Sequence, residues 1–217
     1  PNILKNLSFK IDAGKKYAFV GANGAGKTTI VKLINGLYPD YEGEILVNGE
    51  DIHHFERGFL SNVFQDFARY PVSVRENITI GRKDQVSEEE LLQVVREVGL
   101  DNTVERLEDG LDTVLGKVKE ESLDLSGGEW QKVALARCAL SKAPVRILDE
   151  PTSAMDPVYE NEIYQRFQQI SQGKTVLLIS HRLASVKMSD FIFVIADGAV
   201  AEAGSHWELM EKNGLYR

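Results

Sequence analysis

The sequence contains a single cysteine, Cys138, among its 217 residues. A lone cysteine cannot form an internal disulfide, so the simplest expectation is that the chain folds in a reducing compartment. Cys138 lies in the run ALARCAL, which reads as helix, and we expect it to be a small core residue. Hydrophobic residues make up 43% of the chain, which is enough for a sizeable core.

Long apolar stretches are missing as well. No stretch approaches the ~18 residues that a membrane-spanning helix needs, and the two strongest, VLLIS (176–180) and FIFVIA (191–196), have the length of strands. No signal peptide is visible at the start. Pro1 leads directly into a strand-like pattern and Arg217 directly follows a predicted helix, so we expect the chain to be a piece of a longer protein.

Positive charge is scarce, since 25 lysines and arginines face 33 acidic residues and the formal net charge is −8. An acidic chain gains nothing from counterion release on DNA or RNA, so no nucleic-acid partner is expected. The same balance argues against a basic membrane-surface binder. Because internal repeats and low-complexity linkers are also lacking, we expect one domain over residues 1–217, with two lobes at most.

Apolar periodicity and turn residues predict an α/β fold with an antiparallel start, a central parallel sheet, and a helical insertion over roughly residues 67–140. Capping boxes are predicted at Ser87–Glu90 and Ser205–Glu208, and a two-residue hairpin turn at Asp197–Gly198. The predicted strands are 4–11, 16–20, 43–49, 145–149, 175–180 and the hairpin 191–203, and the main helices begin near residues 27, 88, 129 and 157.

The first chemical motif lies between a predicted strand and a predicted helix and fits the phosphate-binding P-loop pattern. Glycines let backbone N–H groups surround phosphate oxygens, and the helix N-terminus adds partial positive charge. A lysine at the end of the loop reaches the β- and γ-phosphates, and the following threonine offers its hydroxyl to Mg²⁺. The motif comprises Gly21, Ala22, Asn23, Gly24, Ala25, Gly26, Lys27 and Thr28, with Thr29 next in the helix.

Two further motifs gain meaning from this loop. Asp149 ends a predicted strand of the same sheet, which brings its carboxylate near the metal, and Glu150 is suited to accept a proton from the attacking water. Leu125–Glu129 (LSGGE) again offers a serine hydroxyl and backbone N–H groups at a helix start, from Ser126, Gly127 and Gly128. One chain rarely needs two such sites for one triphosphate, so the second is expected to serve the ATP of another subunit.

Nearly the whole chain resembles the nucleotide-binding domains of ABC transporters. The matching motifs are GANGAGKTT (21–29) for Walker A, NVFQD for the Q-loop, LSGGE for the signature, RILDEPTSAMD (146–156) for Walker B and the D-loop, and LLISHRLASV for the switch histidine. The resemblance implies a P-loop NTPase core with an antiparallel β subdomain and a helical subdomain carrying the signature.

The resemblance also implies roles for single residues. Gln65 is similar to the residue that senses Mg²⁺ and the γ-phosphate, which adds it to Thr28 and Asp149 as metal-side residues. His181 is similar to the histidine that contacts the γ-phosphate and holds the water and Glu150 in place. Asp156 resembles the D-loop aspartate, although it also suits the N-cap of the next helix.

The chain departs from the family pattern at several positions. Glu129 replaces the common glutamine of the signature, and Arg146 interrupts the apolar run before Asp149, so that strand is expected to begin late or to be partly exposed. The aromatic residue that stacks on adenine in this family would fall before Pro1 or be absent, because Tyr17 is expected in the core.

Two functions remain open at this point. The first is the ATPase motor of an exporter, which pairs with a second cassette, as a homodimer or heterodimer, and joins an N-terminal transmembrane domain at the cytosolic face of a membrane. The alternative is a soluble ABC ATPase that serves repair, chromosomes or ribosomes. The segment between Lys27 and Leu125 has no heptads and is too short for a long coiled coil, and the segments 69–81 and 181–216 resemble exporters, so export is favoured.

Overall fold

A computed structural model describes residues 3–55, 57–116, 124–151 and 157–217. The chain forms two compact units. The first comprises Pro1–Asn62, Ala143–Glu150 and Gly173–Arg217, and the second comprises Val63–Lys142 and Pro151–Gln172. The predicted helical insertion, 67–140, falls within the second unit, which continues into 151–172. Among the described residues, no helix combines the length and the apolar character required to cross a membrane.

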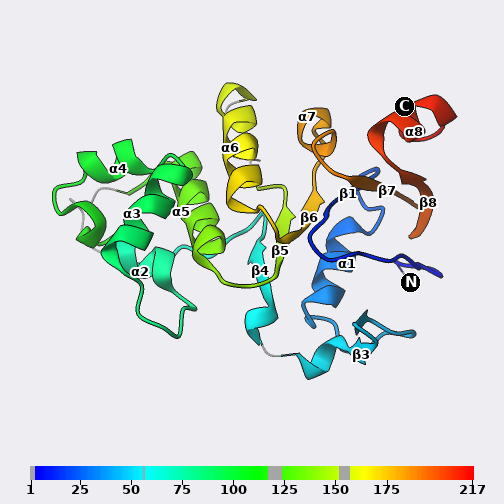
Figure 1. The fold of residues 1–217 in the computed structure, drawn as a ribbon, viewed down its shortest axis with the longest axis horizontal. Helices are drawn as coiled ribbons and strands as arrows, with labels where there is room; N and C mark the ends of the chain where they lie inside the picture. Colours follow the sequence, from blue (N-terminus) through cyan, green and yellow to red (C-terminus); the bar gives the residue numbers. More distant parts are fainter. Residues whose placement is uncertain (1–2, 56, 117–123, 152–156) are drawn as a thin grey trace. The chain divides into compact units, whose positions relative to one another are not determined.

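A six-stranded, mostly parallel sheet forms the centre of the first unit, as predicted, with the strand order β4-β5-β6-β1-β7-β8 (Figure 1). Strand β1 runs parallel to β6 and β7, β5 runs parallel to β6, and β8 returns antiparallel to β7. The strands are β1 Lys16–Val20, β4 Leu60–Val63, β5 Val145–Asp149, β6 Thr175–Ile179, β7 Phe191–Ala196 and β8 Ala199–Gly204.

The helices of the first unit are α1 Lys27–Ile34, α7 Leu183–Val186 and α8 His206–Lys212, with 3₁₀ turns η1 Ile52–His54 and η2 Arg57–Phe59. All five residues of β6 are buried, because a central parallel strand has no face left for water. Aromatic rings fill the neighbouring core, where Phe193 stacks on both Tyr17 and Phe19. Tyr17 is 3% exposed, which confirms it as a core residue.

The turns and caps at the C-terminal end of the first unit match the sequence patterns. Asp197 and Gly198 both have positive φ, 49° and 80°, as a two-residue hairpin turn between β7 and β8 requires. Ser205 and Glu208 form the predicted capping box at the start of α8. Their side chains satisfy backbone donors that the first turn of a helix otherwise leaves without partners.

Two predicted strands are wrong or shortened. Residues 4–11 do not form a strand: Asn6 has a left-handed φ of 51°, which breaks the extended run, although Lys5 N–H donates to the Gly198 carbonyl. Of the predicted strand 43–49, only β2 Leu46–Val47 is paired, antiparallel to β3 Glu50–Asp51. The turn that joins them has positive φ at residues 48 and 49, as a two-residue hairpin turn requires, and the pairing covers two residues of each strand.

The expectation for Arg146 is also wrong. Strand β5 begins at Val145, and Arg146 is only 2% exposed. Its backbone is paired in register with Val176 of β6, so the position inside the sheet overrides the polarity of the side chain.

The second unit is helical in its described part (Figure 1). Helix α5 packs against α2, α3 and α6, and Cys138 in α5 is 1% exposed, which confirms it as a core residue. Helix α5 begins at Gly127, two residues earlier than predicted, because Ser126 caps it. The helices are α2 Val74–Thr79, α3 Glu88–Glu97, α4 Asp101–Arg106, α5 Gly127–Leu140 and α6 Pro157–Ile170, with the 3₁₀ turn η3 Gly110–Asp112.

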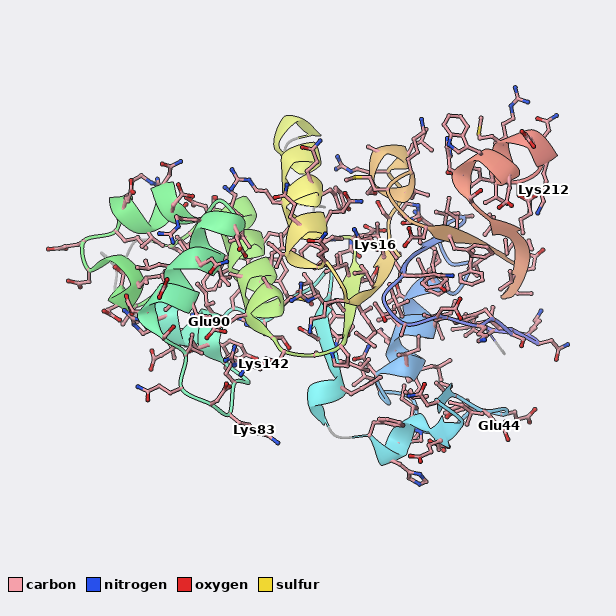
Figure 2. The ribbon with its side chains drawn as sticks, viewed as in Figure 1. Lys16, Glu44, Lys83, Glu90, Lys142 and Lys212 are labelled. Carbon is pink, nitrogen blue, oxygen red and sulfur yellow. The ribbon has the colours of Figure 1, made fainter. Side chains whose placement is uncertain are left out.

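Helix α3 has the predicted start and buried face, but only half of the predicted capping box. The Ser87 side chain accepts the N–H of Glu90, whereas the Glu90 carboxylate accepts from Arg82 at 3.0 Å instead of reaching back to Ser87. Arg82 also binds Asp84, which accepts from Lys142 at 2.6 Å. Figure 2 shows Glu90 and Lys142, two members of this charged cluster, close together. The apolar spacing of the sequence predicts that Leu91, Val94, Val95 and Val98 share one helical face, and all four are buried.

Helix α6 begins at Pro157, as predicted, and Gly173 follows its end with a φ of 76°. Phe167 is buried and Ile170 is half-buried. The spacing of the sequence predicts that Tyr159 and Ile163 share the buried face of this helix with Phe167 and Ile170, but the side chains of Tyr159 and Ile163 lie outside the described part of the structure.

Candidate functional site

The central strands bring three sequence motifs to one edge of the sheet in the first unit. Asp149 at the end of β5 is in register with Ile179 at the end of β6, and Ile179 is in register with Phe19 near the end of β1. Because these strands are parallel, the segments that follow them start from the same edge. Those segments are the P-loop, Glu150 and the turn that contains His181.

The P-loop runs from β1 to α1 through three glycines with positive φ, namely Gly21 at 148°, Gly24 at 81° and Gly26 at 106°. A Cβ atom on Gly26 would lie 2.5 Å from a methyl carbon of Leu4, whereas a Cβ atom on Gly24 would have no neighbouring atom within 4 Å. Gly26 therefore packs against the protein, and Gly24 leaves an open face on the loop. Ala22 and Asn23 are exposed with Gly24, and Ala25 is half-buried.

Lys27 is the first residue of α1 and is only 6% exposed. Its ammonium group donates to the carbonyl oxygens of Gly21 at 2.8 Å and Ala22 at 3.0 Å, so the side chain is folded back along the loop. Burial lowers the pKa of Lys27, and the nearby carboxylates of Glu150 and Asp149 partly oppose this effect. The loop thus holds a cation beside its own backbone, ready to meet an anion.

Asp149 is 3% exposed at the end of β5 and is hydrogen-bonded to the side chain of Thr28. Burial raises the pKa of Asp149 above its ordinary value, the bond to Thr28 lowers it, and the charge of Glu150 raises it again. Burial outweighs the favourable charges of Lys27 and Lys32, so the ionised carboxylate gains from a further cation. Thr29, the next residue of α1, is half-buried.

Glu150 and His181 form a pair, with 3.0 Å between Glu150 Oε1 and His181 Nε2. Glu150 has an unusual left-handed φ of 47°, and its N–H donates to the Ile179 carbonyl at 3.0 Å. This backbone turn directs the Glu150 side chain away from the strand line that Asp149 follows. Both side chains are partly exposed, 27% for the glutamate and 39% for the histidine, so the pair faces solvent.

The turn that carries His181 is held by two serines that the sequence patterns did not single out. The Ser185 hydroxyl donates to the Ser180 hydroxyl at 2.7 Å, and the Arg182 N–H donates to the same Ser180 oxygen at 3.1 Å. Ser180 and Ser185 are nearly inaccessible to solvent. The spacing S-H-x-x-x-S is the only local signal for this support.

The signature element belongs to the second unit. Ser126 is exposed at the N-cap of α5, and its side chain accepts the Glu129 N–H at 3.3 Å. The hydroxyl and the N–H of Ser126 both donate to Oε2 of Glu129, at 2.8 and 2.9 Å. This capping box leaves the first-turn N–H groups of Gly127 and Gly128 without intrahelical partners, as at any helix start.

The second carboxylate oxygen of Glu129 is held from α4. Oε1 of Glu129 accepts from the Thr103 hydroxyl at 2.9 Å and pairs with the guanidinium group of Arg106. Partial burial raises the pKa of Glu129, but the bonds from Ser126 and Thr103 and the charge of Arg106 together keep it below its ordinary value. Thr103 and Arg106 lie far from the signature in the sequence, so no local pattern could have revealed them.

The remaining predicted residues lie elsewhere. Gln65 is exposed just after β4 and belongs to the second unit, with Ser126, Gly127 and Gly128. Asp156 lies outside the described residues. The structure therefore brings together the P-loop, Asp149, Glu150 and His181. Lone histidines are mostly structural, so we expect no chemical role for His53, His54 and His206. His206 shares a hydrogen bond with the Tyr216 hydroxyl, and His53 lies beside Tyr41.

Comparison with known proteins places this arrangement in a family. The family model described as "ABC transporter" matches residues 4–153. The subtilin transport ATP-binding protein SpaT of Bacillus subtilis is 39% identical over 99% of this chain and 36% of its own length. The ATP-dependent lipid A-core flippase of Escherichia coli K12 is 38% identical over 98% of this chain and 37% of its own length.

A solved structure of a bacterial Atm1-family ABC exporter with ATP bound superimposes with a TM-score of 0.88 at 38% identity. It covers 99% of this chain, which in turn spans 37% of that exporter. The chain thus spans little more than a third of the length of the relatives it matches. With a family match over most of the chain and relatives well above 30% identity, this chain belongs to the ABC transporter family as an ATP-binding domain.

Proposed function

We propose that this domain binds and hydrolyses Mg-ATP in a head-to-tail pair of cassettes and thereby powers the export of a substrate across a membrane. The observation that carries the proposal is the Glu150–His181 pair at the sheet edge where the P-loop begins. Relatives named for subtilin transport and lipid A-core flipping favour export over a soluble ATPase.

ATP would bind along the P-loop. Backbone N–H groups of Gly24, Gly26, Thr28 and Thr29 would surround the phosphates, and Lys27 would exchange its two carbonyl partners for the β- and γ-phosphate oxygens. That exchange is favourable because a buried ammonium group pairs better with an anion than with neutral carbonyls.

The residues beside Lys27 fit a magnesium ion. Asp149 supplies a buried carboxylate whose pKa burial raises in spite of the nearby charges of Lys27 and Lys32, and Thr28 already shares a hydrogen bond with it. The described residues hold no cluster of three or more metal-binding side chains. Mg²⁺ needs few protein ligands when phosphate oxygens and water supply the others, so Asp149 and Thr28 would suffice within the first unit, and Gln65 stays a predicted metal-side residue. Bound Mg²⁺ would offset the charge of the phosphates.

Glu150 would orient and deprotonate the attacking water. Its carboxylate is 27% exposed to solvent, and His181 holds it by the 3.0 Å contact. Once ATP is bound, His181 would also donate to the γ-phosphate. The left-handed backbone at Glu150 keeps this carboxylate apart from Asp149, so that one serves water and the other the metal.

The pairing proposal follows from two phosphate-binding elements in one chain. The P-loop belongs to the first unit and the signature to the second. In a head-to-tail pair, Ser126, Gly127 and Gly128 of one cassette would cover the ATP held by the other, and Asp156 would lie at the shared interface. The partner is a second cassette, identical or related, and a transmembrane domain N-terminal on the same chain would place the pair at the cytosolic face of a membrane.

Light scattering tests the proposal with the Glu150→Gln chain, in which hydrolysis is blocked while the shape of the side chain is kept. We expect a monomer with ADP and a dimer with Mg-ATP, because only ATP carries the γ-phosphate that bridges the two cassettes. Adding Ser126→Arg should abolish the dimer and leave ATP binding to the monomer intact. Lys27→Ala should remove most ATP binding, measured by calorimetry.

Two outcomes with the same variants would contradict the proposal. A Glu150→Gln chain that stays monomeric in Mg-ATP at high concentration, with calorimetry showing bound ATP, would contradict the shared site. Unchanged ATP affinity in folded Lys27→Ala would instead contradict the P-loop assignment.

A further inference from the structure

The Glu129 carboxylate is the centre of a small hydrogen-bond network at the start of α5. One carboxylate oxygen accepts the hydroxyl and the N–H of Ser126. The other accepts the Thr103 hydroxyl at 2.9 Å and pairs with Arg106. The signature serine is therefore tied, through a single carboxylate, to two residues of α4.

This network matters because the Ser126 hydroxyl has only one proton to donate. That proton now goes to Glu129, so Ser126 must leave the carboxylate before it can donate to a phosphate. The Glu129 side chain is also 20% exposed beside an exposed Ser126, so its negative charge faces the same space as an incoming triphosphate. The Glu129 carboxylate and the triphosphate repel each other unless a nearby cation offsets one of the charges.

Arg106 is the cation that offsets this charge. Its guanidinium group is paired with Glu129 while its side chain remains 68% exposed. Thr103, which is 5% exposed, fixes the same oxygen from the protein side and so limits the directions in which the carboxylate can turn. Without these two partners, the carboxylate would be free to swing toward the phosphate side.

We propose that Arg106 and Thr103 are positioning residues that hold and neutralise Glu129, and so set how strongly Ser126 binds the γ-phosphate of the ATP held by a second copy. The proposal rests on the proposed pairing of two cassettes. It assigns a function to α4, and it explains how an acidic residue is tolerated in an element that must meet phosphate.

A simpler role for Glu129 is helix capping alone, and the chain offers a variant that separates the two. Glutamine at the third helical position completes a capping box as glutamate does. Glu129→Gln therefore keeps the cap and removes the charge. If capping were the whole role, Arg106 would affect the stability of α5 but not the affinity between two ATP-bound cassettes.

The experiment compares four chains that all carry Glu150→Gln: the parent, Arg106→Ala, Glu129→Gln, and both together. Dimer dissociation constants are measured in Mg-ATP by analytical ultracentrifugation. We expect Arg106→Ala to weaken the dimer by about fivefold, the upper effect of one exposed ion pair, and the double variant to return within about twofold of the parent. Glu129→Gln alone should not weaken the dimer.

Matched controls separate charge from folding. Arg106→Lys keeps the positive charge and should keep most of the affinity, whereas Lys83→Ala removes one positive charge from the same unit at a site distant from α4, as Figures 1 and 2 show, and should change nothing. Melting curves check that each variant is folded. ATP binding to the monomer, measured by calorimetry, should be the same in all chains.

The fluorescence of Trp130 reports on the signature directly. Trp130 is 2% exposed, and its indole N–H donates to Asp124 at 2.8 Å, directly beside the signature. The second tryptophan, Trp207, is 75% exposed. In a Trp207→Phe background, Trp130 emission should change with Mg-ATP in the parent, and the change should require about fivefold more protein in Arg106→Ala.

The inference is overturned if Arg106→Ala dimerises as well as the parent, or if its defect persists when Glu129→Gln is added. Absence of a dimer in the parent would instead refute the proposed pairing, and this inference with it. The two failures are therefore told apart by the parent chain alone.

Discussion

Replacing Gly21 or Gly24 by alanine should separate the structural from the ligand-binding glycines of the P-loop. Both have positive φ, 148° and 81°, so each alanine pays a similar conformational cost of about 1–2 kcal/mol. The surroundings differ. A Cβ at Gly21 would lie 3.1 Å from the carbonyl carbon of Ile195 and closer still to its oxygen, whereas nothing lies within 4 Å at Gly24.

The magnitudes follow from this difference. Gly21→Ala must push the loop away from β7, and overpacking of this kind costs a further 1–3 kcal/mol, which makes about 3 kcal/mol in total. For a chain of this length, each kcal/mol shifts the melting temperature by roughly 2–4 °C. We therefore expect a loss of about 6–12 °C for Gly21→Ala and about 2–8 °C for Gly24→Ala, with the larger loss for Gly21→Ala because it carries the overpacking cost in addition to the conformational cost.

The assay is thermal unfolding by circular dichroism without nucleotide, followed by calorimetry with ATP. Gly24→Ala should bind ATP much more weakly although it remains folded, because its methyl group points to the open face of the loop. Equal melting temperatures for the two variants would refute the reasoning, as would undiminished ATP affinity in Gly24→Ala.

Three further substitutions test the site and its surroundings. Asp149→Asn should weaken Mg²⁺-dependent ATP binding far more than binding in EDTA. It should also raise the melting temperature of the nucleotide-free chain at pH 7. The reason is that the pKa of Asp149 is raised in the folded chain, so its ionisation destabilises the fold as the pH rises above the pKa of the unfolded chain. An equal loss of affinity in both buffers would count against the metal role. His181→Ala should lower kcat by about tenfold or more and leave ATP affinity within a few-fold, and a normal rate would show that its contact with Glu150 is only structural. Arg82 and Lys142 hold the pKa of Asp84 well below its ordinary value, so Asp84→Asn should lower the melting temperature at pH 7. That difference should begin to shrink as the pH falls below about 4, where the carboxyl of the unfolded chain becomes protonated, and it should be lost only as the pH approaches the lowered pKa of the folded carboxyl; a difference that does not shrink in acid would contradict the assignment.

Sequence patterns were most informative where one local rule decides the structure. The buried strands, the Asp197–Gly198 turn and the α3 core face each depend on neighbours in sequence, and all were predicted correctly. The apolar alternation of 4–11 failed because strand formation needs a partner strand, and Asn6 turns the chain away from one. Arg146 failed for the opposite reason, since pairing with β6 keeps a polar residue inside the sheet.

The sequence predicts the residues of the site but not the residues that hold them in place. The P-loop and Asp149–Glu150 are contiguous motifs, so they could be read directly. The serines beneath His181 and the α4 residues that hold Glu129 act through contacts that only folding creates. The capping box at Ser87 shows the same limit, because a distant competitor, Arg82, takes the Glu90 carboxylate.

The left-handed backbone at Glu150 has a consequence for the evolution and engineering of this domain. A non-glycine residue in that region costs of order 1 kcal/mol, which glycine would recover. A selection for heat resistance alone would therefore favour Glu150→Gly, at the expense of the carboxylate that His181 contacts. Residue 150 is thus a point where stability and turnover oppose each other, and a stabilised variant of this cassette should be sought at other positions.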